Sequence, residues 1–215
     1  MTNQQTDQQP TDASRPTSDQ APGYIIWFLV VVMMLNSMGI GLIMPVMPSL
    51  LEELTDLPVN SLALWGGLLT LTYAGMQFLM SPTLGNLSDR FGRRPVILIS
   101  LGLYAFDQLL MALAPTLAFL FVARFLSGAS AATYATANAV IADTTPRDKR
   151  AAKFGLLGAA FGLGFVFGPL IGGFLAEYGS RAPFYAASAC TAIAFIVGFF
   201  LLPGTLKPEE RRPFE

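Results

Sequence analysis

Hydrophobic residues come in long uncharged stretches that short polar segments separate along most of the chain. No charged residue occurs in positions 20–51, 57–88, 154–176 or 182–206. About 20 apolar residues suffice for a helix to cross the hydrocarbon core of a bilayer, and such stretches are too long for barrel strands. The pattern predicts six transmembrane helices, at Tyr24 to Met47, Leu62 to Leu84, Pro95 to Ala114, Leu117 to Ala142, Phe154 to Leu175 and Pro183 to Leu202.

The composition of the 215 residues supports this prediction. Hydrophobic residues make up 53% and charged residues only 13%, whereas soluble domains carry about 25% charged residues. We therefore expect an all-α, multi-pass protein of the cell (cytoplasmic) membrane, with the lipid bilayer as its main partner. The net charge of -1 and the lack of a basic stripe give no reason to expect a nucleic-acid partner.

The first 23 residues differ from the rest, because they contain five Gln with several Thr, Ser, Pro and Asp and almost nothing apolar. Such a segment cannot bury enough surface to offset its chain entropy. Only Arg15 is basic before the first apolar stretch, which is too long for the core of a cleavable signal peptide. We expect a disordered cytoplasmic tail at 1–23, followed by a six-helix transmembrane domain at 24–202.

The Lys and Arg residues predict the orientation, because cytoplasmic connections collect them. Eleven fall in the tail, the connections after the second and fourth spans, and the C-terminal segment: Arg15, Arg90, Arg93, Arg94, Arg147, Lys149, Arg150, Lys153, Lys207, Arg211 and Arg212. The opposite side has Arg181 alone, and its first loop carries Glu52, Glu53 and Asp56. Both termini are therefore predicted to be cytoplasmic.

Two ionisable residues, Asp107 and Arg124, lie well inside the spans, where a charge costs several kcal/mol. The short connection at Pro115 and Thr116 predicts an antiparallel hairpin. At 1.5 Å per residue, both side chains lie roughly 12 to 14 Å below its turn. An ion pair, direct or through water, is expected if both face the bundle interior.

This pair has two interpretations. Burial disfavours a charged carboxylate and a guanidinium favours it, so the protonation of Asp107 can respond to its surroundings, as proton coupling requires. A static pair that holds two helices together explains the two residues equally well.

The connection from Gly85 to Pro95 combines turn residues with charges. Gly85 and Gly92 are expected to let the chain turn, and Pro95 suits the first turn of the third helix. Its charged residues, together with a second acid at the end of the fourth span, are Asp89, Arg90, Arg93, Arg94 and Asp143. Such a network can lock one face of a bundle in one conformation, although an Arg cluster alone is usually an orientation signal.

The fifth span contains seven glycines and one internal proline. Gly164, Gly168 and Gly172 are four residues apart and share one face, which allows a neighbouring helix to approach closely. Pro169 removes a backbone donor, so a kink is expected there. The alternative is a tightly packed helix with no moving part.

Several polar residues inside the spans are candidates for lining a wet cavity: Asn36, Ser37, Gln77, Gln108, Thr133, Tyr134 and Asn138. Interhelical hydrogen bonds are the alternative explanation for each. We predict that Asn36, Gln77, Gln108 and Asn138 belong to the same path as Asp107 and Arg124.

These features together resemble the major facilitator superfamily, and within it the drug/proton antiporters close to the tetracycline exporters. Gly85 to Pro95 is similar to the family's G-x-L-x-D-R-x-G-R-R motif, and Arg124 with Gly128 is similar to its R-x-x-x-G motif. The antiporter signature of helix five is matched by Gly164, Gly168, Pro169, Gly172 and Gly173, and Met38 to Pro45 resembles the first helix of the tetracycline group.

The resemblance implies the N-terminal half of a twelve-helix transporter, built from 3+3 inverted repeats, that exports amphipathic compounds such as drugs by alternating access. It assigns Asp89, Arg93 and Asp143 to the charge relay of a cytoplasmic gate, Arg124 to proton coupling and Asp107 to the substrate and proton path. Residues 203–215 then begin the central cytoplasmic loop. The implied partners are protons, a small-molecule substrate, and a second six-helix half or a second copy of the chain.

The first span departs from the pattern of the tetracycline exporters at one position. Asn36 stands where those exporters typically have an Asp, so an ionisable group is missing there. The alternative to a complete transport unit is a truncated or split fragment, which inserts in the membrane but needs a second half to transport.

The chain has no His, hence no Ser-His dyad or H-E-x-x-H zinc site. We therefore expect no enzyme, no cofactor and no metal.

Overall fold

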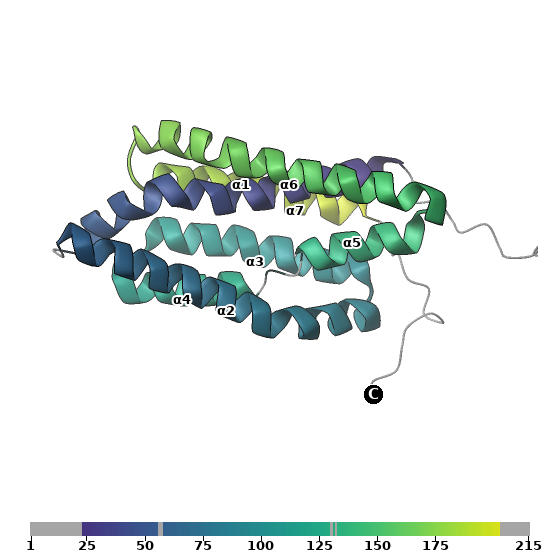
Figure 1. The fold of residues 1–215 in the computed structure, drawn as a ribbon, viewed down its shortest axis with the longest axis horizontal. Helices are drawn as coiled ribbons and strands as arrows, with labels where there is room; N and C mark the ends of the chain where they lie inside the picture. Colours follow the sequence, from purple (N-terminus) through teal and green to yellow (C-terminus); the bar gives the residue numbers. More distant parts are fainter. Residues whose placement is uncertain (1–22, 56–57, 130, 132, 203–215) are drawn as a thin grey trace, which may run out of the picture.

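The structure, a computed structural model, describes residues 23–55, 58–129, 131 and 133–202. Over these ranges the chain forms helices joined by short connections (Figure 1). The helices are α1 (Gly23–Leu54), α2 (Val59–Phe91), α3 (Arg93–Leu113), α4 (Leu117–Ala129), α5 (Thr133–Thr144), α6 (Arg147–Ala176) and α7 (Ala182–Leu201). The predicted tail, apart from Gly23, and the predicted loop at 203–215 lie outside the described residues.

The prediction of six transmembrane helices is confirmed. Six helical spans in the described part of the chain are long and apolar enough to cross a bilayer, with Leu117–Thr144 counted as one span. That span is described as α4 and α5, with a non-helical Ala131 between them whose N–H donates to the Gly128 carbonyl at 3.3 Å. The predicted fourth span, Leu117 to Ala142, is thus matched by α4 and α5 together.

Several predicted boundaries are also wrong, because hydropathy reports the part of a helix that meets lipid rather than the whole hydrogen-bonded helix. α1 continues through Pro45 and Pro48 to Leu54, and α6 begins at Arg147 instead of Phe154. The predicted connection from Gly85 is largely helical, since α2 runs to Phe91.

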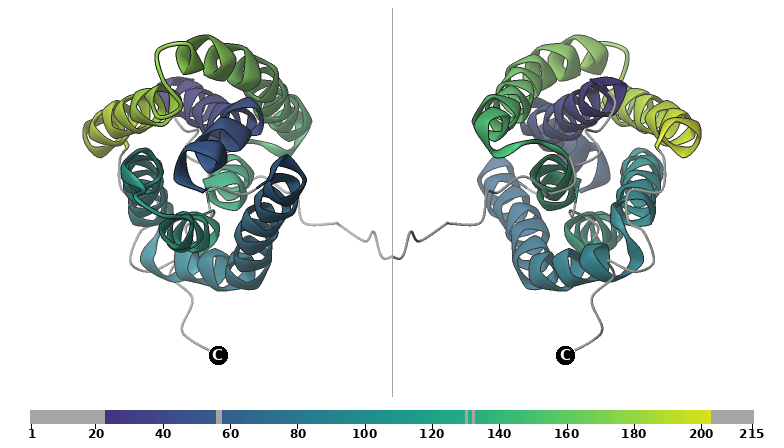
Figure 2. Two further views of the ribbon diagram at one scale, coloured as in Figure 1. Left: turned by 90° about the vertical axis from the view of Figure 1, so that its left-hand side faces the viewer. Right: turned by 90° about the vertical axis from the view of Figure 1, so that its right-hand side faces the viewer.

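The helices pack in pairs that are distant in sequence. α1 packs along α6, α3 packs along α7, and α2 packs along α4. End-on views show α1 beside α6 and α7 on one side of the bundle, with α2 and α4 on the other (Figure 2). In the most apolar windows of α1 and α3, 61% of residues are buried, against 11% in α2, so α1 and α3 form the core and α2 an outer wall.

Glycines explain how closely α1 and α6 approach. A Cβ atom added to Gly164 would collide with the Met34 carbonyl, and one added to Gly168 would collide with the Met38 carbonyl. A Cβ atom on Gly172 would make a tight contact with Leu42, 3.1 Å away, so the predicted small-residue face of α6 is confirmed. The Ser37 hydroxyl then donates to the Phe161 carbonyl across this contact at 2.6 Å.

The remaining glycines of α6 point elsewhere. A Cβ atom on Gly155, Gly158, Gly162 or Gly173 would meet no other atom within 4 Å. α6 continues as a helix through Pro169, whose ring lies against Gly41 of α1. The kink at Pro169 stays a prediction.

Two apolar clusters fill the bundle interior. One is built on the first halves of α1 and α3, around Leu29 and Leu101, and the other on their second halves, around Leu50 and Met111. Buried polar residues lie between the two clusters: Ser37, Tyr104, Asp107, Gln108, Arg124 and Ser127. We call these six residues the central polar layer.

Candidate functional site

The centre of the polar layer is the pair formed by Asp107 of α3 and Arg124 of α4. Arg124 Nη2 lies 3.6 Å from Asp107 Oδ2, and the two side chains are 6% and 0% exposed. The hairpin that joins α3 to α4 turns at Ala114, Pro115 and Thr116, which sets both residues at one depth. The predicted ion pair is therefore confirmed as a direct contact.

Aromatic and amide groups surround this pair. The Arg124 guanidinium carbon lies 5.7 Å from the centroid of the Tyr73 ring of α2, a cation–π contact. Gln108 Nε2 donates to the Tyr104 hydroxyl at 3.0 Å, and that hydroxyl donates to the Asn36 carbonyl of α1 at 3.2 Å. The polar layer thus connects α1 to α3, and through Arg124 it reaches α2 and α4.

The hydrogen bonding of this layer is incomplete. Oε1 of Gln108, and Nε and Nη2 of Arg124, are buried without a hydrogen-bond partner in the described chain. Buried polar groups left in this state cost free energy, and such groups call for a functional explanation. The layer is therefore the strongest candidate site in the bundle.

The other predicted path residues are placed differently. Asn36 contributes its backbone carbonyl, while its side chain is half-buried. Asn138 donates within its own helix to the Tyr134 carbonyl at 2.9 Å, and Gln77 is a half-buried residue of α2. Among the four, only Gln108 brings its side chain into the polar layer, and the role of each remains a prediction.

Sequence reasoning missed two aromatic residues of this site, Tyr73 and Tyr104. Tyr104 had a usable signal, because it lies one helical turn before Gln108 on the face that carries Asp107. The sequence contains no comparable signal for Tyr73, since Tyr73 belongs to α2 and only the packing of the helices brings its ring over Arg124.

A second cluster lies where α2 meets α3, at what we call the Arg93 end of the bundle. Arg93 Nε donates to Asp143 Oδ2 of α5 at 2.9 Å, and its Nη1 pairs with Asp89 and donates to the Ser88 hydroxyl at 3.1 Å. The Arg93 side chain is only 12% exposed. The predicted contact of Asp143 with this motif is confirmed, so one guanidinium ties together α2, α3 and α5.

The rest of the motif needs two corrections. Gly85 does not turn the chain, because α2 continues through it, and Gly92 alone makes the turn with a φ of 96°. The guanidinium of Arg94 binds elsewhere than Asp89 and Asp143, since its Nη2 donates to the Phe199 carbonyl of α7 at 2.7 Å. The guanidinium of Arg90 lies over the ring of its neighbour Phe91.

A third cluster, which the sequence did not predict, lies at the opposite end of the bundle, which we call the Glu53 end. Arg181 Nε donates to Glu53 Oε1 at 2.9 Å, and Arg181 Nη1 donates to the Ala112 carbonyl of α3 at 3.1 Å. The Ser180 hydroxyl donates to the other oxygen of Glu53. These bonds join α1, α3 and the connection between α6 and α7. In the described part of the chain, no group of three or more His, Cys, Asp or Glu side chains gathers as a metal site.

Comparison with known proteins places these features in context. The Major Facilitator Superfamily is matched over residues 29–215. Tetracycline resistance protein, class B, of Escherichia coli is 47% identical over 171 residues, which is 80% of this chain and 42% of that protein. Multidrug resistance protein 2 of Bacillus subtilis (strain 168) is 37% identical over 175 residues, which is 81% of this chain and 42% of that protein.

A solved structure is similar in fold. The crystal structure of the human organic anion transporter MFSD10 (TETRAN) matches with a TM-score of 0.78 and 27% sequence identity, over 88% of this chain and 50% of that chain. The chain thus spans about half the length of the curated relatives and of the solved structure that it matches.

Proposed function

Because the chain belongs to the major facilitator superfamily, we propose that it forms one half of a proton-coupled exporter of small amphipathic compounds such as drugs. The six membrane-capable spans of the described residues make it a multi-pass protein of the cell membrane. These relatives are named as resistance proteins and the related structure as a transporter, not as enzymes.

The observation that carries the proposal is the buried contact between Asp107 and Arg124. A proton on Asp107 removes its negative charge and weakens its attraction to Arg124. The pair then holds α3 and α4 less strongly, and a state of the bundle that separates the two groups becomes more populated. Proton binding in this way biases an equilibrium between two conformations, because the two states differ in their affinity for the proton.

The Arg93 end supplies the second part of the proposal. Arg93 bridges α2, α3 and α5 through Asp89 and Asp143, so a movement of any one of these helices has to break an ion pair. We assign this cluster to the gate on the cytoplasmic side, the side that the distribution of Lys and Arg indicates.

A second six-helix unit completes the proposed transporter. The relatives are about twice as long as the stretch that this chain covers, and the substrate of such a carrier binds between two halves. The second unit belongs to the same longer chain, to a separate protein or to a second copy.

The test is substrate efflux from membrane vesicles with an imposed pH gradient, with and without a co-expressed second half. Asp107→Asn is expected to abolish efflux driven by the gradient, because Asn cannot exchange a proton. Asp148→Asn is the matched control, since Asp148 is exposed in the first turn of α6. Proton-driven efflux that survives Asp107→Asn would overturn the coupling assignment.

A fragment that inserts but transports nothing alone is the alternative to assembly from two copies of this chain. The fragment predicts efflux only when a different second half is supplied, whereas two assembled copies predict efflux by the 215-residue chain alone. The size of the particle on a native gel distinguishes a single bundle from a pair of bundles.

A further inference from the structure

Tyr104 reaches from α3 to the backbone of α1 in the central polar layer. Its hydroxyl donates to the Asn36 carbonyl at 3.2 Å and accepts from Gln108 Nε2 at 3.0 Å. In the described part of the chain, the bond to Asn36 is the one direct hydrogen bond between α1 and α3. The backbones of these two helices have little contact, since α1 packs along α6 and α3 packs along α7. A long side chain is therefore needed to connect α1 with α3 at this depth.

The direction of these hydrogen bonds is fixed. A carbonyl oxygen only accepts, so the Tyr104 hydroxyl gives its single proton to Asn36 and can only accept from the amide of Gln108. Gln108 therefore turns its Nε2 toward Tyr104, and its Oε1 is left buried without a hydrogen-bond partner in the described chain. The hydroxyl thus sets the orientation of one side chain of the polar layer as well as the position of α1.

The middle of α1 is shaped to receive the tyrosine. A Cβ atom on Gly39 would collide with the Tyr104 hydroxyl and would lie 2.8 Å from Gln108 Nε2. On the side that faces α6, the backbone of α1 lies against Gly164 and Gly168. The middle of α1 is therefore held between α6 and one side chain of α3.

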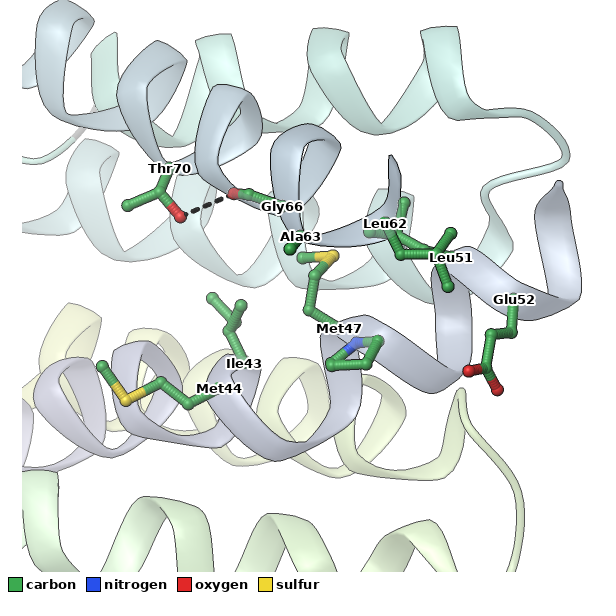
Figure 3. A pocket seen from close by; sticks show the side chains of 10 residues that line it. Ile43, Met44, Met47, Leu51, Glu52, Leu62, Ala63, Gly66 and Thr70 are labelled. Carbon is green, nitrogen blue, oxygen red and sulfur yellow. Dashed lines mark hydrogen bonds between the residues drawn. The ribbon is translucent and has the colours of Figure 1, made fainter. Parts of the chain in front are cut away.

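The helix α2 gives α1 less support. Farther along α1, a groove lies between the two helices, with Met47 on the side of α1 and Gly66 on the side of α2 (Figure 3). At the Glu53 end, Arg181 links α1 to α3 a second time. Near the polar layer, the contacts that fix α1 are therefore those with α6 and with Tyr104.

We propose that Tyr104 is a positioning residue of the proton-coupling site, and that it passes a displacement of α3 on to α1. The inference rests on the proposed function, in which protonation of Asp107 loosens α3 from Arg124. Tyr104 lies about one helical turn before Asp107 on the same helix, so it moves with the acid. Its bond to Asn36 then carries α1 along, together with α6, which packs on α1.

Asp107 is the group whose charge changes in this step. The titratable and charged side chains near it are Arg124 of α4, Tyr73 of α2 and Tyr104 of its own helix. Both tyrosines are neutral at physiological pH, so Arg124 is the charged partner that a protonated Asp107 releases. Tyr104 itself neither gives nor receives the proton, and its part is to hold α1 in place relative to α3.

The test measures distances between spin labels in the full chain, held in nanodiscs, at neutral and at acidic pH. The background is Cys190→Ser, and pairs of labels are placed on exposed positions of α1, α2 and α3: Trp27→Cys, Phe78→Cys and Ile99→Cys. The Ile99–Phe78 pair reports movement of α3 against α2, and the Trp27–Phe78 pair reports movement of α1 against α2. We expect acid to change both distances in the parent protein and neither distance in Asp107→Asn.

Tyr104→Phe keeps the ring and removes the hydroxyl. We expect this variant to retain the acid-driven change between α3 and α2 and to lose the change between α1 and α2. A tyrosine that only stabilises the bundle would affect the unfolding temperature and leave both changes in place. Tyr185→Phe, which removes an exposed hydroxyl of α7, is the matched control and is expected to keep both changes.

Gly39→Ala tests the same contact from the side of α1. Its methyl group displaces the Tyr104 hydroxyl, so the change between α1 and α2 is expected to be lost as in Tyr104→Phe. Gly162→Ala, whose methyl group meets nothing within 4 Å, is expected to keep that change.

The outcomes distinguish this inference from the proposed function. If acid changes neither distance in the parent protein, or still changes both in Asp107→Asn, the coupling mechanism is overturned and this inference with it. If Asp107→Asn behaves as expected but Tyr104→Phe retains both changes or loses both, the role of Tyr104 alone is overturned.

Discussion

At the scale of single residues, the buried pair shows what sequence arithmetic can and cannot reach. Asp107 and Arg124 were placed at one depth by counting from the turn at Pro115, because helix rise per residue is constant. Counting does not tell which way a side chain points around the helix axis. The direct contact at 3.6 Å is therefore new information from the packing of α3 against α4.

The energy of this pair can be tested by a double substitution. Arg124→Gln alone leaves Asp107 buried without its countercharge, and the loss of one partner of a buried pair costs about 3 to 5 kcal/mol. Asp107→Asn combined with Arg124→Gln removes both charges, so its stability is expected to return toward that of the parent protein. Unfolding in detergent micelles measures both changes.

A double variant as unstable as the sum of the two single variants would mean that the two residues do not stabilise each other. The contact would then be incidental to the stability of the bundle.

At the scale of helices, α6 separates into a packed face and an open face. Gly164, Gly168 and Gly172 are required where the backbone of α1 lies against them, and the other glycines have no such neighbour. The sequence identified the packed face by its spacing of four. It did not identify α1 as the partner, because many faces can accept small residues.

The two faces predict opposite effects of one substitution. Gly168→Ala places a methyl group against the Met38 carbonyl, and overpacking of this kind costs about 1 to 3 kcal/mol. Gly162→Ala meets nothing within 4 Å, so it should leave stability unchanged or raise it, because Ala favours a helix over Gly. Thermal unfolding of the purified variants measures the difference, and equal destabilisation of both would refute the packed-face assignment.

Helix ends were the weakest part of the sequence prediction. Gly85 was expected to turn the chain, but α2 continues through it and Gly92 makes the turn. Glycine permits a turn without requiring one. A backbone with a φ of 96°, as at Gly92, is a conformation that only the fold around it determines.

At the scale of the whole molecule, an ion cluster at each end holds helices together, and a polar layer lies between two apolar clusters. Arg93 joins three helices at one end, and Arg181 joins the Glu53 carboxylate to α3 at the other. In the proposed function, protonation of Asp107 weakens the contact between α3 and α4 at this centre, and the ion clusters at the two ends oppose the separation of the helices.

The orientation of this bundle in the membrane is testable by cysteine labelling. Cys190 is the single cysteine and is exposed, so Cys190→Ser provides the background. The positive-inside rule predicts that Glu177→Cys reacts with a membrane-impermeant maleimide in intact cells, whereas Lys149→Cys reacts only after permeabilisation. The opposite result would invert the assignment of the Arg93 end to the cytoplasm.

The number of spans, the family and the hairpin carrying Asp107 and Arg124 followed from the order of residues, because hydropathy, motif spacing and helix rise are local along a chain. The pairing of α1 with α6, the place of Tyr73 over Arg124 and the link between Glu53 and Arg181 join residues far apart in sequence. Many pairs of helix faces are compatible with one another. The pairs that form depend on how all the helices pack together, so they are determined only in the folded bundle.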